Sequence, residues 1–284
     1  MNKFGVSTHL YHAQRLCRDH LVEIAAHGFE CVEVYATRTH FDYHSPSAIA
    51  DLQGWLADTG LELRSIHAPT AESFVGGRWS GSLSLASSDA AARARAVSET
   101  EAALHVARRL PVPVLVAHLG IPRFQRGDTP VAPHNADSRA AAKRSIEELL
   151  TVAEPLGVQI AVEVIPNELS RAGSIVHFVE HDLDGVGICL DFGHAHLDGD
   201  VIDAVETVSE HLIATHLHDN RGRSDDHLLP FDGTIDWAGT LLAVQKVGYD
   251  GPFMFEIVPA GSTKDTLARA RAIRQRIEKM MANG

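Results

Sequence analysis

Three acidic side chains stand in or directly after strongly apolar stretches of this sequence. Glu163 lies within A-V-E-V-I, Glu256 lies within M-F-E-I, and Asp191 follows I-C-L. Burying a carboxylate is costly unless it is paired or bound to a cation. Since no Lys or Arg stands in these stretches, a shared divalent metal ion accounts for the three acids better than three separate ion pairs do.

Histidines close or follow several apolar stretches of the same kind. The clearest are His67 in S-I-H, His118 in V-A-H, His194 in D-F-G-H and His216 in T-H-L-H. Mixed imidazole and carboxylate ligands suit Zn, Mn, Fe or Co better than Ca, which prefers oxygen ligands. We therefore expect a divalent metal cofactor, with Mn, Zn, Co and Mg as the candidates.

The segment that follows T-H-L-H-D-N adds further polar groups. Asp225 and His227 are two residues apart, so in an extended segment they would project to the same side and could bind a second metal. The alternative is a solvated polar loop. Arg221 either binds a substrate hydroxyl or phosphate or lies on the surface.

Five other side chains are weaker candidates for the same site. His9 and His12 follow the first apolar stretch and could line a pocket. Glu33, inside C-V-E-V-Y, either faces the pocket as a substrate-binding residue or forms a buried pair with a neighbouring strand. Phe74 and Trp79 are either lid residues or members of a small separate core.

Short apolar runs alternate with helix-length segments along the whole chain. Their interiors are apolar without strict alternation, as in parallel strands covered on both faces. The runs are Lys3–Thr8, Cys31–Tyr35, Leu61–His67, Pro113–His118, Gln159–Ile165, Gly187–Asp191, Leu212–His218 and Pro252–Ile257. Eight such repeats predict one (β/α)8 TIM barrel, a single domain over residues 1–284. A doubly wound sheet is the rival, but no G-x-G-x-x-G follows the first run.

The candidate acids and histidines fall near the C-terminal ends of these predicted strands. Barrel enzymes place their chemistry at that end, so we expect the side chains to meet at one mouth. Helices are predicted at Ser88–Leu110, Asp137–Leu156 and Lys264–Met281. The segments Ala71–Ser87 and Ile121–Pro133, rich in Gly, Pro and Ser, are predicted to be long loops, which are often lids.

Composition narrows the class of protein. The net charge is −12, which argues against a broad basic face and so against nucleic acid as a partner. Three cysteines, with no close pair, favour a reducing compartment. The N-terminus has no apolar signal segment, and no apolar run approaches the length of a membrane span. We expect a cytoplasmic protein without membrane contact, and a homo-oligomer is left open.

Four motifs are more specific than composition. They are C-L-D-F-G-H-A-H at 189–196, H-L-H-D-N at 216–220, D-x-H-L-x-P-x-x-G-x-I-D-W at 225–237 and G-Y-D-G-P-F-M-F-E-I at 248–257. With them the sequence resembles, over nearly its whole length, the xylose-isomerase-like TIM barrels. That superfamily holds sugar phosphate isomerases and epimerases and the family-2 apurinic (AP) endonucleases.

The two branches of this superfamily imply different sites. The epimerase branch implies one metal, two Glu that double as catalytic acid and base, and substrate contacts. The metal ligands would be Glu163, Asp191, His216 and Glu256. Two of them, Glu163 and Glu256, would also be the catalytic acid and base. The residues that bind substrate would be His67, His194, Arg221 and Glu33. The endonuclease branch implies up to three zinc ions, with His67, His118, His194, Asp225 and His227 as additional metal ligands.

The sequence departs from the endonuclease pattern at two strand ends. It has H-L-G at 118–120 where the endonucleases have H-P-G, and E-V-I at 163–165 where they have E-N-T. These departures favour an isomerase or epimerase of a small carbohydrate, a sugar, sugar phosphate or related hydroxy-carbonyl compound, that works by proton transfer through an enediolate. A dehydratase would use the same site. The alternatives are a zinc phosphodiesterase acting on DNA and a non-catalytic regulatory barrel.

Overall fold

A closed barrel of parallel strands forms the centre of the protein. The computed structural model describes residues 2–123, 134–259 and 261–283. The barrel strands are β1 (Phe4–Ser7), β2 (Cys31–Tyr35), β3 (Glu62–His67), β6 (Val114–Ala117), β7 (Gln159–Glu163), β8 (Gly187–Asp191), β9 (Leu212–Leu217) and β10 (Phe253–Phe255). Closure comes from parallel pairing of β1 with β10, in which Gly5 lies opposite Met254.

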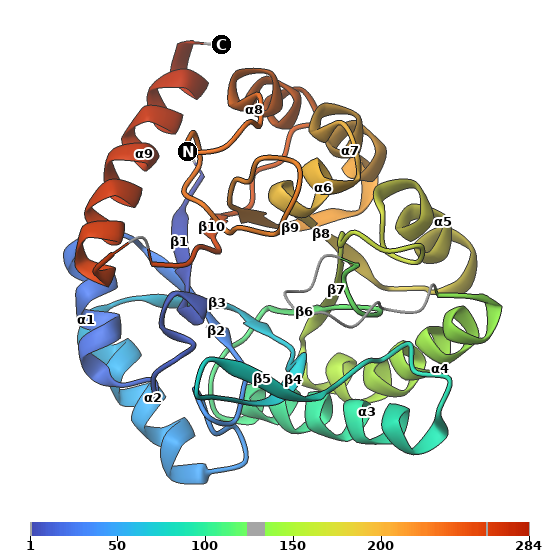
Figure 1. Ribbon diagram of the computed structural model, residues 1–284. Helices are drawn as coiled ribbons and strands as arrows, with labels where there is room; N and C mark the ends of the chain where they lie inside the picture. The colour runs from blue at the N-terminus through green and yellow to red at the C-terminus, as the bar shows by residue number, and fades with distance from the viewer. Residues whose placement is uncertain (1, 124–133, 260, 284) are drawn as a thin grey trace.

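Helices surround this barrel and alternate with its strands (Figure 1). They are α1 (Arg18–Ala26), α2 (Pro46–Thr59), α3 (Ala90–Leu104), α4 (Ala136–Ala153), α5 (Ala172–Asp182), α6 (Phe192–Asp198), α7 (Val201–Val208), α8 (Trp237–Lys246) and α9 (Thr263–Asn283). The predicted (β/α)8 TIM barrel is therefore confirmed. Within the described residues, no helix is both long and apolar enough to cross a lipid bilayer.

Local signals explain where several helices begin and end. The Ser45 hydroxyl accepts a hydrogen bond from the Ala48 amide and Pro46 is the first residue of α2, both common at helix starts. Gly60 ends the same helix in the left-handed conformation. Asp89 caps α3, and the helix predicted to reach Leu110 ends at Leu104, followed by a short 3-10 turn at His105–Arg108.

The segment Ala71–Ser87 is not the irregular loop that its composition predicts. It contains an antiparallel hairpin of β4 (Ala71–Val75) and β5 (Arg78–Ser82), which lies in front of the barrel in Figure 1. Gly76 and Gly77 both have positive φ, and paired left-handed residues are what a two-residue hairpin turn needs. Most of the other predicted loop, Ile121–Pro133, lies outside the described residues.

Alternation along the strands sends the polar side chains into the barrel mouth. Ala161 and Cys189 belong to a small apolar cluster with Val114 and Val116. Side chains two residues further along a strand point to the same face, so Glu163 and Asp191, the last residues of β7 and β8, project above this cluster. The barrel is thus apolar below and acidic at its mouth.

Candidate metal centre

One group of ligand-type side chains lies at the ends of four strands. Glu163, Asp191, His216 and Glu256 are all buried, and each offers an atom within 4.8 Å of the others. His216 Nδ1 lies 3.4 Å from Glu163 Oε1, 3.8 Å from Asp191 Oδ2 and 3.4 Å from Glu256 Oε2. The structure therefore brings together the four positions that the epimerase pattern implies.

A second group contains His67, His118 and the same Glu163. Both histidines approach one oxygen: His67 Nε2 lies 3.2 Å and His118 Nε2 lies 3.0 Å from Glu163 Oε2. The other oxygen, Oε1, faces His216 and His194. Glu163 thus stands between two groups and could bridge two cations.

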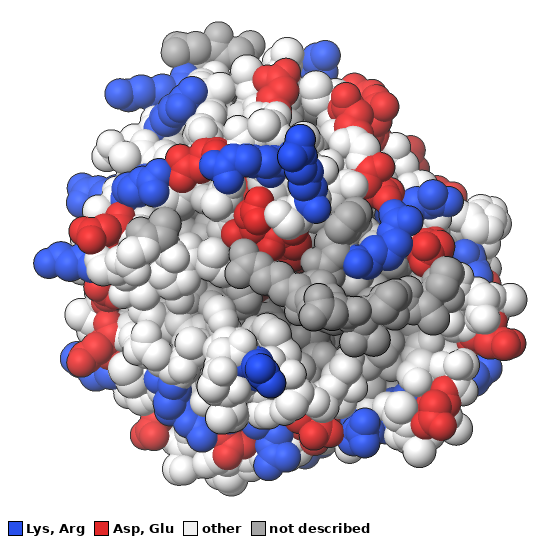
Figure 2. Space-filling view, in the orientation of Figure 1, with Lys and Arg blue, Asp and Glu red and all other residues white. Residues whose placement is uncertain are grey.

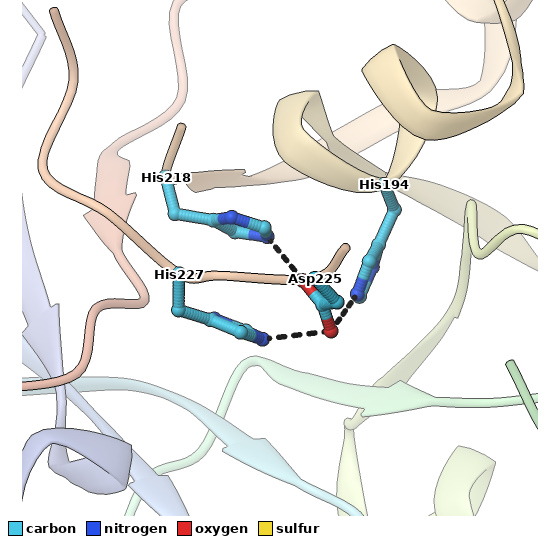
Figure 3. Close-up of side chains that lie close together, drawn as sticks. All are labelled: His194, His218, Asp225 and His227. Atoms are coloured by element: carbon cyan, nitrogen blue, oxygen red, sulfur yellow. Dashed lines mark hydrogen bonds and ion pairs between the residues drawn. The ribbon is translucent and has the colours of Figure 1, made fainter. Parts of the chain in front are cut away.

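A third group forms beside the barrel axis from α6 and the segment after β9 (Figure 3). Asp225 Oδ2 lies 3.2 Å from His194 Nε2 and 3.1 Å from His227 Nε2, and Asp225 Oδ1 lies 3.9 Å from His218 Nε2. Ligand atoms of a tetrahedral ion with bonds of about 2.0 Å stand about 3.3 Å apart. The four side chains are therefore close to the spacing that one zinc-like ion requires.

Local structure explains how this third group forms. Asp191 caps α6 by accepting the His194 amide at 2.7 Å, which fixes His194 one turn above the strand. A Cβ at Gly193 would lie 2.0 Å from the His218 ring, so only glycine leaves room for that imidazole. Asp219 holds the loop that carries Asp225, because it accepts hydrogen bonds from the Trp237 indole at 2.8 Å and the Phe231 amide at 3.0 Å.

The structure brings Asp225 and His227 together, as their spacing predicted, although the backbone is not regularly extended at His227. His227 has a φ of 45°, in the left-handed region that residues other than glycine rarely adopt. Its Nδ1 lies 2.9 Å from the Glu256 carbonyl oxygen, which turns Nε2 toward Asp225. The spacing predicted that the two side chains meet, but it did not predict the left-handed backbone through which they do so.

His218 follows β9 as a potential ligand at a strand end, and the structure adds it to the third group although neither family pattern includes it among the metal ligands. It is fully buried, its Nε2 lies 2.9 Å from Asp191 Oδ1, and its ring stacks on His227 with centroids 4.0 Å apart. The signal was present: His216 and His218 are two residues apart at a strand end, so both project to one face.

Electrostatics couple the acids and histidines strongly. Burial lowers the pKa of His67, but the hydrogen bond and charge of Glu163 outweigh it and raise that pKa to about 9. Asp225 does the same for His227, whose pKa also rises to about 9 against the effect of burial. Burial raises the pKa of Glu163, yet His118 and His216 hold it well below its usual range. Each group is stabilised in its charged form by the others.

Several observations test whether these residues fit a cation. Asp191 Oδ2 and Asp225 Oδ1 are buried without a hydrogen-bond partner. Within the described part of the chain, neither Glu163 nor Glu256 forms an ion pair with Lys or Arg; their charged neighbours are histidines. A bound cation would supply the missing compensation for these buried carboxylates. The donor set therefore fits a divalent metal.

Glu33, predicted to contact substrate or a neighbouring strand, lies behind His216. Its Oε2 accepts the Ser65 hydroxyl at 2.8 Å and lies 3.1 Å from His216 Nε2, and the side chain is fully buried. With the Nε2 proton donated to Glu33, the Nδ1 lone pair of a neutral His216 faces three carboxylates. That arrangement is repulsive unless Nδ1 carries a second proton or a cation lies between, so it also fits a metal.

The remaining candidates lie outside the three groups. Arg221 is exposed, and its Nη2 is 3.5 Å from the Asp232 carbonyl oxygen of its own loop. His9 lies beside the third group, with its ring 5.0 Å from that of His227, and His12 stacks on His9. A substrate role for Arg221 stays a prediction.

Comparisons with known proteins identify the family. The chain matches the xylose isomerase-like TIM barrel family over residues 21–281 and belongs to it. It is 23% identical over 248 residues to an inosose isomerase of Bacillus velezensis, a match that covers 81% of this chain and 79% of the relative. An uncharacterized protein of Sinorhizobium fredii is 37% identical over 150 residues, and that match spans 47% of the relative and 49% of this chain.

A solved structure agrees with this assignment. The crystal structure of a D-tagatose 3-epimerase-like protein superimposes with a TM-score of 0.78 at 26% sequence identity, covering 99% of this chain and 98% of that one. The shared architecture extends from β1 to α9 and includes the mouth where the three groups lie.

Proposed function

We propose that the protein is a divalent-metal-dependent isomerase or epimerase of a small sugar, sugar phosphate or related hydroxy-carbonyl compound. The names of its relatives, an inosose isomerase and a D-tagatose 3-epimerase-like protein, support a substrate of this class. The observation that carries the proposal is the buried group of Glu163, Asp191, His216 and Glu256, which combines a cation site with two carboxylates able to move a proton.

In this proposal the four residues of the first group hold the metal. When bound, a divalent cation supplies Lewis-acid polarisation of two adjacent substrate oxygens. Glu163 or Glu256 takes the proton from the carbon next to the carbonyl, and the other Glu returns one on the opposite face. His194 and Arg221 hold substrate oxygens. The burial of both Glu side chains keeps bulk water away from the reacting carbon, while the proton on each carboxyl group exchanges with solvent between turnovers.

A zinc phosphodiesterase remains the second candidate because of one observation. All nine positions of the endonuclease pattern fall into the three groups, with Glu163 shared between two of them. Such an arrangement suits hydrolysis by two or three ions. Against it stand the strand-end departures H-L-G and E-V-I and the net charge of −12, which offers little to a phosphate backbone.

Metal counting combined with a substrate screen separates the two functions. We expect the purified protein loaded with Mn²⁺ or Co²⁺ to exchange the α proton of ketoses or inososes with deuterium from solvent. Three zinc ions per chain, nicking of abasic DNA and no α-proton exchange with any ketose would instead establish the phosphodiesterase. One ion per chain with neither activity would leave the regulatory barrel.

Replacing Glu33 tests the assignment of His216 as a ligand. We expect Glu33→Gln to weaken Mn²⁺ binding about 10–100-fold, because a carboxylate that accepts the second ring proton fixes the tautomer and raises the basicity of the metal-bound nitrogen. Titration calorimetry of the metal-free protein measures this. Ser65→Ala should act in the same direction with a smaller effect.

The matched control for this experiment is Glu30→Gln. Glu30 precedes β2 and pairs with Arg274, away from the mouth. Its replacement should leave Mn²⁺ affinity unchanged. Equal affinity of the Glu33→Gln variant and the wild type would show that Glu33 does not act on a metal ligand.

A further inference from the structure

Five rings from three separate segments form a continuous surface at one side of the barrel mouth. We call this surface the aromatic wall; it consists of His9, His12, Tyr35, Phe74 and Trp79. His9 belongs to the 3-10 turn Thr8–Tyr11 that follows β1, and His12 comes directly after it. Tyr35 ends β2, and Phe74 and Trp79 lie opposite each other in the β4–β5 hairpin.

Each ring of the wall contacts the next. Trp79 stacks on His12 with centroids 5.3 Å apart and touches Phe74 at 4.6 Å. His12 stacks on His9 at 4.7 Å, and Tyr35 meets both His9 at 4.9 Å and Trp79 at 5.9 Å. The hairpin therefore does not stand free of the barrel but packs its two aromatic rings against the turn after β1.

The wall is continuous with the metal centre. His9 lies 5.0 Å from the ring of His227, and Tyr35 lies 5.0 Å from the ring of His67. Two of the three metal-type groups thus each touch the wall. A substrate long enough to extend from the metal centre toward His67 or His227 would therefore meet the wall.

Hydrogen bonds hold the wall in place without using all its polar atoms. The Phe74 amide donates to Thr39 Oγ1 at 2.9 Å, and the Tyr35 hydroxyl pairs with Thr70 Oγ1 at 3.0 Å. His9 is nine-tenths buried, yet its Nδ1 has no hydrogen-bond partner. Trp79 is 42% exposed, although so large an apolar side chain gains most when it is covered.

We infer that the aromatic wall binds the part of a neutral sugar or inosose remote from its carbonyl group, with C–H bonds on Trp79 and hydroxyls near His9. This inference rests on the proposed function and adds the class of substrate. Ligand pockets typically combine apolar, aromatic surface with a few polar groups, and a carbohydrate presents both kinds of surface at once.

The apolar rings of the wall favour a neutral substrate over a phosphorylated one. Five buried or nearly buried carboxylates line the centre next to the wall: Glu33, Glu163, Asp191, Asp225 and Glu256. Figure 2 shows acidic side chains gathered near the middle of this face. With one divalent cation bound, these carboxylates balance the charges of the cation and of the protonated His67, His194 and His227, so the centre has little net positive charge to attract a phosphate dianion. Tyr35, Phe74 and Trp79 offer ring faces, whereas a phosphate needs cationic or N–H donors. Burial lowers the pKa of His9 and His12, which favours the uncharged form of both imidazoles.

The test compares substrates of different length in the metal-loaded protein. We expect Trp79→Ala to raise the KM for a six-carbon ketose about tenfold, with kcat within about twofold. The KM for dihydroxyacetone, followed by deuterium exchange, should not change, because a three-carbon substrate does not reach the wall. Trp79→Phe should restore most of the affinity. Leu242→Ala, an equally exposed apolar side chain on α8 (44% exposed), is the matched control and should change nothing.

Binding of a hexitol, which has no carbonyl group, makes the result independent of turnover. Calorimetry should show weaker hexitol binding to Trp79→Ala than to the wild type. That result together with no exchange of any ketose would end the isomerase proposal and leave the wall as a carbohydrate site. Equal hexitol binding by the two proteins, an equal rise in KM for both ketoses, or a lower KM for the 6-phosphate than for the free ketose would overturn the inference.

Discussion

Glu163→Gln and Glu256→Gln should each lower turnover of a ketose by about 10²–10⁴-fold, the usual contribution of a positioned acid or base. The amide preserves shape and can still offer an oxygen to a cation, but it cannot accept a proton. Both carboxylates are buried beside His216, so solvent cannot take over. The rate is measured with saturating Mn²⁺, and metal content is determined for each variant, because both residues are also proposed ligands.

Measuring α-proton exchange with each epimer separately shows which Glu acts on which face of the substrate. If each Glu serves one face of the substrate, one variant should lose α-proton exchange with one epimer and the other variant with the other epimer. A suitable control is Glu180→Gln, because Glu180 belongs to an exposed acidic group with Glu210 and His211 on the outside of the barrel. Wild-type exchange rates for both epimers in either Glu variant would rule out the two-base mechanism.

Removal of the metal should abolish turnover completely and reversibly. The three groups at the mouth offer nitrogen and carboxylate donors but no Lys or Arg partner within the described residues, so the proposed chemistry has no substitute for the cation. Dialysis against a chelator, followed by addition of Mn²⁺, Co²⁺, Zn²⁺ or Mg²⁺ in turn, measures both the loss and the preferred ion. Full activity in protein shown by elemental analysis to be metal-free would refute the metal-dependent mechanism.

The apparent affinity of the metal-free protein for a metal should depend steeply on pH. In the metal-free protein, Glu163 and Asp225 raise the pKa of His67 and His227 to about 9 from an ordinary value of 6.5. Both imidazoles therefore carry protons at neutral pH, and a metal must displace them. Where these histidines are ligands, apparent affinity rises with pH up to about 9, by about tenfold per unit for each proton displaced. Calorimetry in buffers of different ionisation enthalpy counts those protons.

Short stretches of sequence were enough to predict many of the residues at the mouth of the barrel. An acid inside A-V-E-V-I or after I-C-L must be paired with a cation or bound to a metal if the stretch is a buried strand, because burying an uncompensated charge is too costly. Strand alternation then predicts which neighbours face the same way. For this reason the identities of Glu163, Asp191, His216 and Glu256 as mouth residues followed from local pattern, and the barrel followed from eight repeats of it.

Which groups touch was decided only by the tertiary structure. Glu163 meets His67, 96 residues earlier, and Glu33 meets His216, 183 residues later, because closure of the barrel brings distant strands to one mouth. The left-handed backbone of His227 and the inclusion of His218 depend on the packing of α6 and the loop held by Asp219. The hairpin that carries Trp79 is likewise placed at the mouth by the turn after β1, against which it packs. Local sequence determined which residues are buried and polar; the register and closure of the strands, which no local pattern contains, determined their partners.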